Sequence, residues 1–285
     1  MKYLILVLCG FLSCSKVTIQ GRMARKSIIN TNDSILANCL TFALTSLLFS
    51  VSIGKGIDKN IIIYAALFGI CSASFQIFYA LALKSGPFSI TCLLVNLNMI
   101  LPAIYSIIFF NEKLTVIKCI GMALCIVALV LNTQNDGKKA SLKWFIYVFA
   151  AFFSTGSISI VQKTYAKSPY AGNLMQFLFL GYCIAFLITL VFVVVQKVRK
   201  QPINFKINLK NILFICGIVL SLGAFQYFFT MANSFIDAIV LNPSVSGLST
   251  IFLTISGVLI FRERLTKKQI LSICMGFAAI ILISL

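Results

Sequence analysis

Lys16 is the side chain in this sequence whose type and position most directly suggest chemistry. It is the only charge well inside an apolar segment, and a charge there is costly unless it faces a cavity or reaches the membrane surface. Lys16 could meet an anionic group, such as the carboxylate of a solute. Its long side chain could instead extend to the lipid headgroups. The sequence leaves both interpretations open.

Four glutamines form a second candidate set, because they occupy paired positions in the two halves of the chain: Gln20, Gln76, Gln162 and Gln226. An unpaired amide in hydrocarbon is costly, so we expect all four to face the protein interior. They could hydrogen-bond a solute from two sides. Bonds to neighbouring helices are the slightly favoured alternative.

Further polar side chains lie close to two prolines. Asn96 and Asn98 precede Pro102, while Asn242 and Ser246 flank Pro243. Because proline lacks a backbone donor and leaves a carbonyl free one turn back, polar groups beside it can line a wet cavity, and we favour that role here. Two tyrosines, Tyr79 and Tyr227, could stack on a solute, although anchoring at the membrane interface is the favoured interpretation.

Glu112 and Glu263 each precede the last apolar segment of their half, and each is followed by a basic residue. A carboxylate at a helix N-terminus is stabilised by the free backbone amides there. We therefore interpret both as structural caps of those segments rather than as proton carriers.

Several classes of function lose support from what the sequence lacks. It has no histidine, no C-x-x-C pair and no carboxylate in the middle of an apolar segment. We therefore expect no metal, no cofactor and no enzymatic site, and we expect transport by facilitated diffusion or exchange rather than through a proton relay. The net charge of +18 comes from short basic clusters between apolar runs, which is typical of contacts with lipid headgroups and not with nucleic acid.

The elements that must position these residues are membrane-spanning helices. Of the 285 residues, 60% are hydrophobic and 11% charged, which excludes a soluble domain. About 20 apolar residues cross a bilayer as a helix. Residues 3–21, interrupted by Lys16, are one such segment. Nine uncharged runs give the others: 34–54, 60–83, 85–111, 119–135, 144–162, 168–196, 211–236, 238–261 and 269–285.

The chain repeats itself at an interval of about 150 residues. Phe75-Gln76 recurs as Phe225-Gln226, and Glu112-Lys113-Leu114-Thr115 recurs as Glu263-Arg264-Leu265-Thr266. We predict a first five-helix repeat over 1–135, a linker loop over 136–143 and a second repeat over 144–285. Because five is odd, the second repeat enters the membrane from the opposite side, giving an all-α fold of ten transmembrane helices in two inverted halves.

These motifs resemble the EamA-like transporters of the drug/metabolite transporter superfamily. The resemblance rests on Tyr79-Ala80-Leu81-Ala82-Leu83, on Pro102, and on the two glutamate motifs followed by Gly121 and Gly276. It implies a central cavity lined mainly by the first, third and fourth helices of each half, with the fifth and tenth helices outside, and transport of amino acids, other metabolites, sugars or drugs. The sequence departs from the pattern at Pro243, which lies ten residues before the counterpart of Pro102, and at Ser272, which replaces the glycine.

We therefore expect a multi-pass protein of the plasma membrane that carries a small polar solute by alternating access. An intramembrane enzyme and a non-transporting membrane subunit are the alternatives, and a homodimer is left open. Apart from Lys16, Lys and Arg number 16 in the loops after odd-numbered segments against 7 in the N-terminus and the other loops, which places both termini outside the cytoplasm. The family resemblance implies termini inside, and a terminal reporter fusion distinguishes the two.

Overall fold

The computed structural model describes residues 2–51, 58–86, 88–131, 141–261 and 267–284. Its helices run in chain order as α1 (Lys2–Ser27), α2 (Thr31–Phe49), η2 (Lys59–Ile61), α3 (Ile62–Ser85), α4 (Phe88–Asn96), η3 (Leu97–Met99), α5 (Ile100–Phe110), α6 (Val116–Leu131), α7 (Leu142–Ala166), η4 (Ala171–Asn173), α8 (Leu174–Val198), α9 (Leu209–Ala232), α10 (Ala238–Phe261) and α11 (Lys267–Ser284). The predicted linker falls mostly outside the described residues.

The helices account for ten membrane crossings, as the sequence predicts. Eight spans are long and apolar enough to cross a bilayer, and α6 and α11 contribute two shorter apolar helices. One of the eight is built from α4, η3 and α5 and changes to 3-10 geometry over Leu97–Met99. Pro102 lies in the first turn of α5, and its missing N–H leaves the carbonyl of Asn98 without an α-helical donor, which favours the tighter turn at this point.

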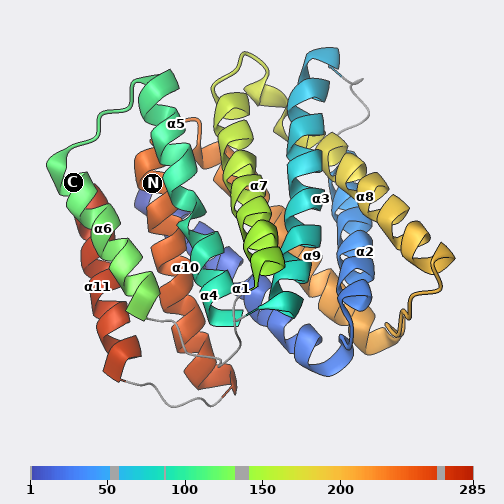
Figure 1. The fold of residues 1–285 in the computed structure, drawn as a ribbon. Helices are drawn as coiled ribbons and strands as arrows, with labels where there is room; N and C mark the ends of the chain where they lie inside the picture. Colours follow the sequence, from blue (N-terminus) through green and yellow to red (C-terminus); the bar gives the residue numbers. More distant parts are fainter. Residues whose placement is uncertain (1, 52–57, 87, 132–140, 262–266, 285) are drawn as a thin grey trace.

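The two halves are inverted relative to each other (Figure 1). Both chain ends lie on one face of the bundle, which we call the terminus face, and α5 ends there, whereas its counterpart α10 ends at the opposite face. The helices α6 and α11 pack along each other at one edge of the bundle (Figure 1). Apolar residues exposed on the helices, among them Leu4, Phe11 and Val191, supply the surface that faces lipid.

An aromatic core joins the halves on the other side of the bundle. Phe68 of α3 packs against Phe177 of α8 with ring centroids 5.2 Å apart, and Tyr165 of α7 stacks on the same Phe177 at 4.1 Å. A Cβ placed on Gly69 would lie 2.5 Å from the carbonyl oxygen of Gly181. Glycine at this position therefore allows α3 and α8 to approach closely.

Candidate functional site

Two seams join the halves through the middle of the bundle. In the first, which we call the α7 seam, α7 packs on α4, η3 and α5. Asn98 of η3 donates to the hydroxyl of Thr155 at 3.4 Å, and the hydroxyls of Thr164 and Tyr105 are 3.4 Å apart. Leu101 lies against Gly156, where a Cβ would come within 2.4 Å of it.

The second seam, the α1 seam, packs α1 on α10. The hydroxyls of Ser13 and Ser249 are 3.1 Å apart, and those of Thr18 and Ser256 are 3.2 Å apart. A Cβ on Gly10 would lie 2.6 Å from the Cβ of Leu248. Close helix packing at a glycine plus short polar contacts therefore recurs in both seams.

One polar contact occupies corresponding positions in the two seams. Ser13 precedes Gln20 by seven residues, just as Thr155 precedes Gln162. Their partners, Ser249 and Asn98, each precede the glutamate of their half by 14 residues. The repeat seen in the sequence is thus also a repeat of contacts between the halves.

Lys16 lies in α1, half-buried. At 100° per residue it shares a helix face with Ser13 and Gln20, and it is turned well away from the exposed Leu4 and Phe11. Gln20 is also half-buried. Among the described residues no hydrogen bond or ion pair involves Lys16. Lys16 and Gln20 thus lie on the side of α1 that carries Ser13, whereas Thr18 lies about 160° around the helix from Lys16.

The other predicted glutamines divide between helix contacts and the interior. Gln162 is 1% exposed, and its amide donates to Gln226 and to the hydroxyl of Thr230, both at 2.7 Å. This contact joins α7 to α9 within the second half, as the structural interpretation of the glutamines predicts. Gln76 of α3 is buried, and no described contact brings it to the other pair.

The remaining candidates are dispersed. The hydroxyl of Tyr79 lies 3.2 Å from the sulfur of Cys92, and Tyr227 packs edge-on against Phe228. Asn96 is exposed. Asn242 is buried and its side chain donates to the backbone carbonyl of Ala238 in the same helix. Ser246 is half-buried and lies one turn after Asn242 on the same face of α10. Pro243 lies inside α10, which continues without a break. The candidates thus flank the seams rather than form one cluster.

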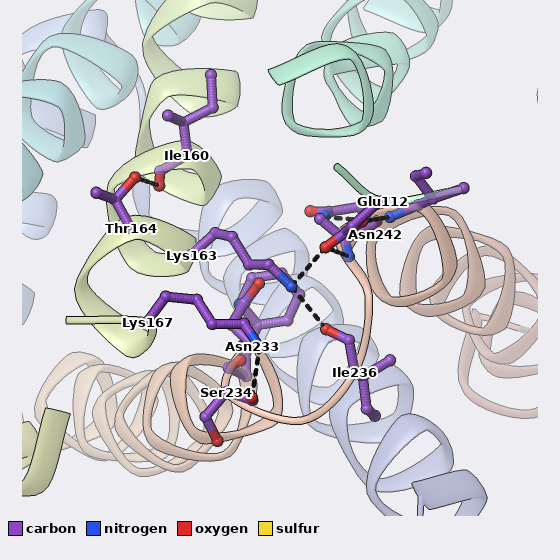
Figure 2. A network of polar contacts seen from close by, with 12 residues as sticks. Glu112, Ile160, Lys163, Thr164, Lys167, Asn233, Ser234, Ile236 and Asn242 are labelled. Carbon is purple, nitrogen blue, oxygen red and sulfur yellow. Dashed lines mark hydrogen bonds and ion pairs between the residues drawn. The ribbon is translucent and has the colours of Figure 1, made fainter. Parts of the chain in front are cut away.

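A charged network at the terminus face joins both halves (Figure 2). The ammonium of Lys163, in the last turn of α7, lies 2.7 Å from a carboxylate oxygen of Glu112 and donates to the carbonyl of Ile236 at 2.9 Å. The carboxylate of Glu112 also accepts the backbone N–H groups of Ala238 and Ile239, at 3.1 and 3.2 Å. We call these five residues the Glu112 network. Both charged side chains are almost fully buried.

The local backbone explains how Glu112 reaches this position. Asn111 ends α5 in the left-handed conformation, with φ 51° and ψ 33°, which asparagine tolerates better than most residues. The chain therefore turns away from the axis of α5 at Asn111, and Glu112 points toward the first turn of α10. There its carboxylate meets free amides and the positive end of the helix dipole.

The expected role of Glu112 is wrong in one respect, because it caps a different helix. Its own downstream helix, α6, begins at Val116, and the hydroxyl of Thr115 accepts the N–H of Lys118 at 3.3 Å. Thr115 is therefore the cap of α6, and Glu112 caps α10 of the other half. Sequence spacing places a carboxylate near the next helix, but the turn at Asn111 redirects it. Glu263 lies outside the described residues.

Lys163 is a candidate site residue that the sequence analysis does not identify, and like Lys16 it is a charged residue within a helix. The uncharged run 144–162 stopped one residue short of it, whereas α7 continues to Ala166 and buries it completely. A signal was present: Lys163 directly follows a repeated glutamine, and the helix dipole favours a lysine in the last turn of a helix, so the helix could continue past this charge.

Within the described ranges no group of three or more Cys, Asp or Glu residues could hold a metal ion. The described side chains of the site offer hydrogen bonds, one buried ion pair and the amine of Lys16. Such groups can bind and release a solute without forming or breaking covalent bonds.

Comparison with known proteins adds three findings. The profile of the EamA-like transporter family matches residues 1–134 and, a second time, residues 142–285. An uncharacterized protein of Haemophilus influenzae is 25% identical over 279 residues, which cover 93% of this chain and 92% of that protein. A solved crystal structure of a protein with 14% sequence identity superposes with a TM-score of 0.76 over 98% of both chains, a likeness that concerns the fold alone.

Proposed function

Because this chain belongs to the EamA-like transporter family, we propose that it moves a small polar solute across a membrane by alternating access between its two halves.

 In such a cycle the solute site opens to each face of the bundle in turn. The chain is a multi-pass membrane protein whose described helices give ten crossings, and the plasma membrane as its location is part of the proposal.

The observation that carries the proposal is the repeated contact between the halves. Ser13 meets Ser249 in the α1 seam, and Thr155 meets Asn98 at the corresponding place in the α7 seam. Single hydrogen bonds between transmembrane helices contribute about 0.6 kcal/mol on average. Seams joined by such weak contacts can separate and reform, which supports rocking of one half against the other.

The position of Lys16 is the reason for which we propose a solute with an anionic group. Its helix is longer than the predicted segment, and the apolar span runs over Lys2–Ala24, so Lys16 lies about 12 Å from the nearer end at 1.5 Å per residue. A side chain placed that deep gains less from extending to the headgroups. The carboxylates of Asp33 and Glu112 are held by other groups. A solute with a carboxylate or phosphate group would neutralise the cation.

Flux into vesicles that contain only the purified protein tests this function. Labelled monocarboxylates, phosphate esters, zwitterionic amino acids and neutral sugars are compared, with protein-free vesicles as the control. We expect saturable flux for at least one anionic class, and we expect it to persist when the proton gradient is collapsed. Absence of flux for every class would contradict the transporter assignment for this set of solutes.

Variants of Lys16 separate the solute class from transport itself. We expect Lys16→Gln to reduce anion flux by about tenfold, since one charge-assisted contact to a partly desolvated anion is worth about 1.5 to 3 kcal/mol. We expect Lys16→Arg to retain more flux, because it keeps the charge. Equal flux of an anion in wild type and Lys16→Gln would remove Lys16 from the solute site and leave the transport function standing.

A further inference from the structure

We propose that the Glu112 network is the contact that closes the terminus face of the transporter, and that it separates when this face opens. The inference rests on the proposed alternating access and adds to it the residues that hold one face shut. In this structure the network is formed, so the terminus face is the closed one.

The position of the network suits closure because it joins three elements at one end of the seams. Glu112 comes from the end of α5 in the first half, Lys163 from the end of α7 and Ile236 from the turn between α9 and α10 in the second half. Figure 2 shows Glu112 and the carbonyl of Ile236 on either side of the ammonium of Lys163. Opening this face by moving α5 away from α7 and α10 would break the bonds of Glu112 to Lys163 and to the start of α10.

The chemistry of the network suits a reversible contact. A buried ion pair gains Coulomb energy but loses the hydration of both charges, so its net contribution to stability is small. When the face opens, water can solvate the carboxylate of Glu112, the ammonium of Lys163 and the free amides of Ala238 and Ile239. The closed and open states can therefore have similar free energies, which a transport cycle requires.

Lys167, the residue that directly follows α7, provides a matched control. It lies one turn beyond Lys163 and donates to the carbonyl of Ser234 at 3.0 Å, in the same turn between α9 and α10, but it is exposed and bonds within its own half. Both Lys163→Met and Lys167→Met remove a hydrogen bond from a lysine to the turn between α9 and α10. Loss of a contact between the halves is specific to Lys163→Met.

A cysteine at Ser246 reports opening without needing a solute. Ser246 is half-buried, two turns into α10 from Ala238, and Ser246→Cys is introduced into a chain whose native cysteines are replaced. A membrane-impermeant thiol reagent is applied from each face in turn. We expect Lys163→Met to raise the reaction rate from the terminus face by about tenfold, a shift of the open population within the range of a coupled contact, and Lys167→Met to leave the rate unchanged.

Two results would overturn the proposal. One is an unchanged rate from the terminus face in Lys163→Met. The other is an equal increase from both faces with a lower melting temperature, which would make the network a structural contact only. If Lys163→Met fails to fold, Glu112→Gln replaces it, because it removes the charge and keeps the length of the side chain. The same two results then decide.

The exchange variant Glu112→Lys with Lys163→Glu sharpens the test. A simple ion pair would be restored by the exchange, whereas the network also needs an acceptor for the amides of Ala238 and Ile239. We therefore expect the exchange variant to react as fast as Lys163→Met. A shift in labelling without flux of any solute would support the closing contact while contradicting the proposed function, so the two failures are distinguishable.

Discussion

Two buried carboxylates join the halves of this protein at opposite faces, and they are held in different ways. Asp33, at the start of α2, accepts the backbone N–H groups of Ile29, Asn30, Asn204 and Phe205. Glu112, at the terminus face, accepts two backbone N–H groups and pairs with Lys163. One carboxylate is held by four amides of the main chain, and the other shares its charge with a side chain.

The difference shows which contact is fixed and which can open. The amides around Asp33 belong to two loop segments whose conformation depends on the carboxylate, because buried N–H groups need an acceptor. The partners of Glu112 are the first turn of α10 and a lysine with a flexible side chain. Asp33 therefore anchors the loops of the two halves, whereas Glu112 is suited to a contact that breaks and reforms.

The largest effect is expected at the anchor. Asp33→Ala leaves four backbone donors without their acceptor, so we expect a loss of about 3 kcal/mol in the free energy of unfolding. Thermal unfolding of the protein in detergent measures this loss as a lower midpoint. A midpoint within error of wild type would show that Asp33 is not an anchor.

A smaller loss of stability is expected at the network. Glu112→Ala removes one buried charge and leaves Lys163 without its partner, but Lys163 lies in the last turn of α7, so in the variant its flexible side chain can extend to the terminus face and regain hydration. We expect the free energy of unfolding to fall by about 1 to 2 kcal/mol. We also expect solute flux per folded molecule to fall by a larger factor in Glu112→Ala than in Asp33→Ala. A reversed order of flux per folded molecule would break the distinction between the two carboxylates.

The α1 seam contains no ion pair between described residues, so we expect it to depend on close packing. A methyl group on Gly10 meets the Cβ of Leu248, which cannot move without the backbone. We expect Gly10→Ala to cost about 1 to 2 kcal/mol. Gly21 lies on the same helix with no atom within 4 Å of the added methyl, so Gly21→Ala is the control and should not destabilise. Equal midpoints for the two variants would contradict the close packing.

The smallest effect is expected at Thr115. If this residue caps α6, Thr115→Ala should lower stability by about 1 kcal/mol and should leave the labelling of Ser246→Cys from both faces unchanged. Thr115→Ser keeps the hydroxyl and serves as the control. A change in labelling as large as that of Lys163→Met would show that α6 and the network are coupled.

Much of the fold follows from the sequence because lipid imposes simple rules. A helix must span the bilayer with about 20 apolar residues, so uncharged runs such as 60–83 and 211–236 locate α3 and α9 closely. The odd number of spans in each half then requires the inversion. The 3-10 turn before Pro102 was not predicted, although proline near Asn98 indicated a local irregularity.

The site was less predictable, because it depends on how helix ends meet. Glu112 was identified as a cap, but its partner helix lies in the other half, and no local pattern specifies that contact. Lys163 is not identified by a search for uncharged runs, because such a run ends at the first charge, whereas an ion pair across the halves allows α7 to continue past Lys163. Gln162 and Gln226 were paired by the repeat, yet their direct hydrogen bond arises from packing of α7 on α9.

The most direct test of the account is to determine, for each half, on which side of the membrane its last helix begins. Lys113 and Lys268 are both exposed, next to the first turns of α6 and α11. In a chain without its native cysteines, Lys113→Cys and Lys268→Cys are labelled with an impermeant thiol reagent on intact cells and on inverted vesicles. The account predicts labelling from opposite sides. Labelling of both from one side would contradict the inverted halves, and with them alternating access around the seams.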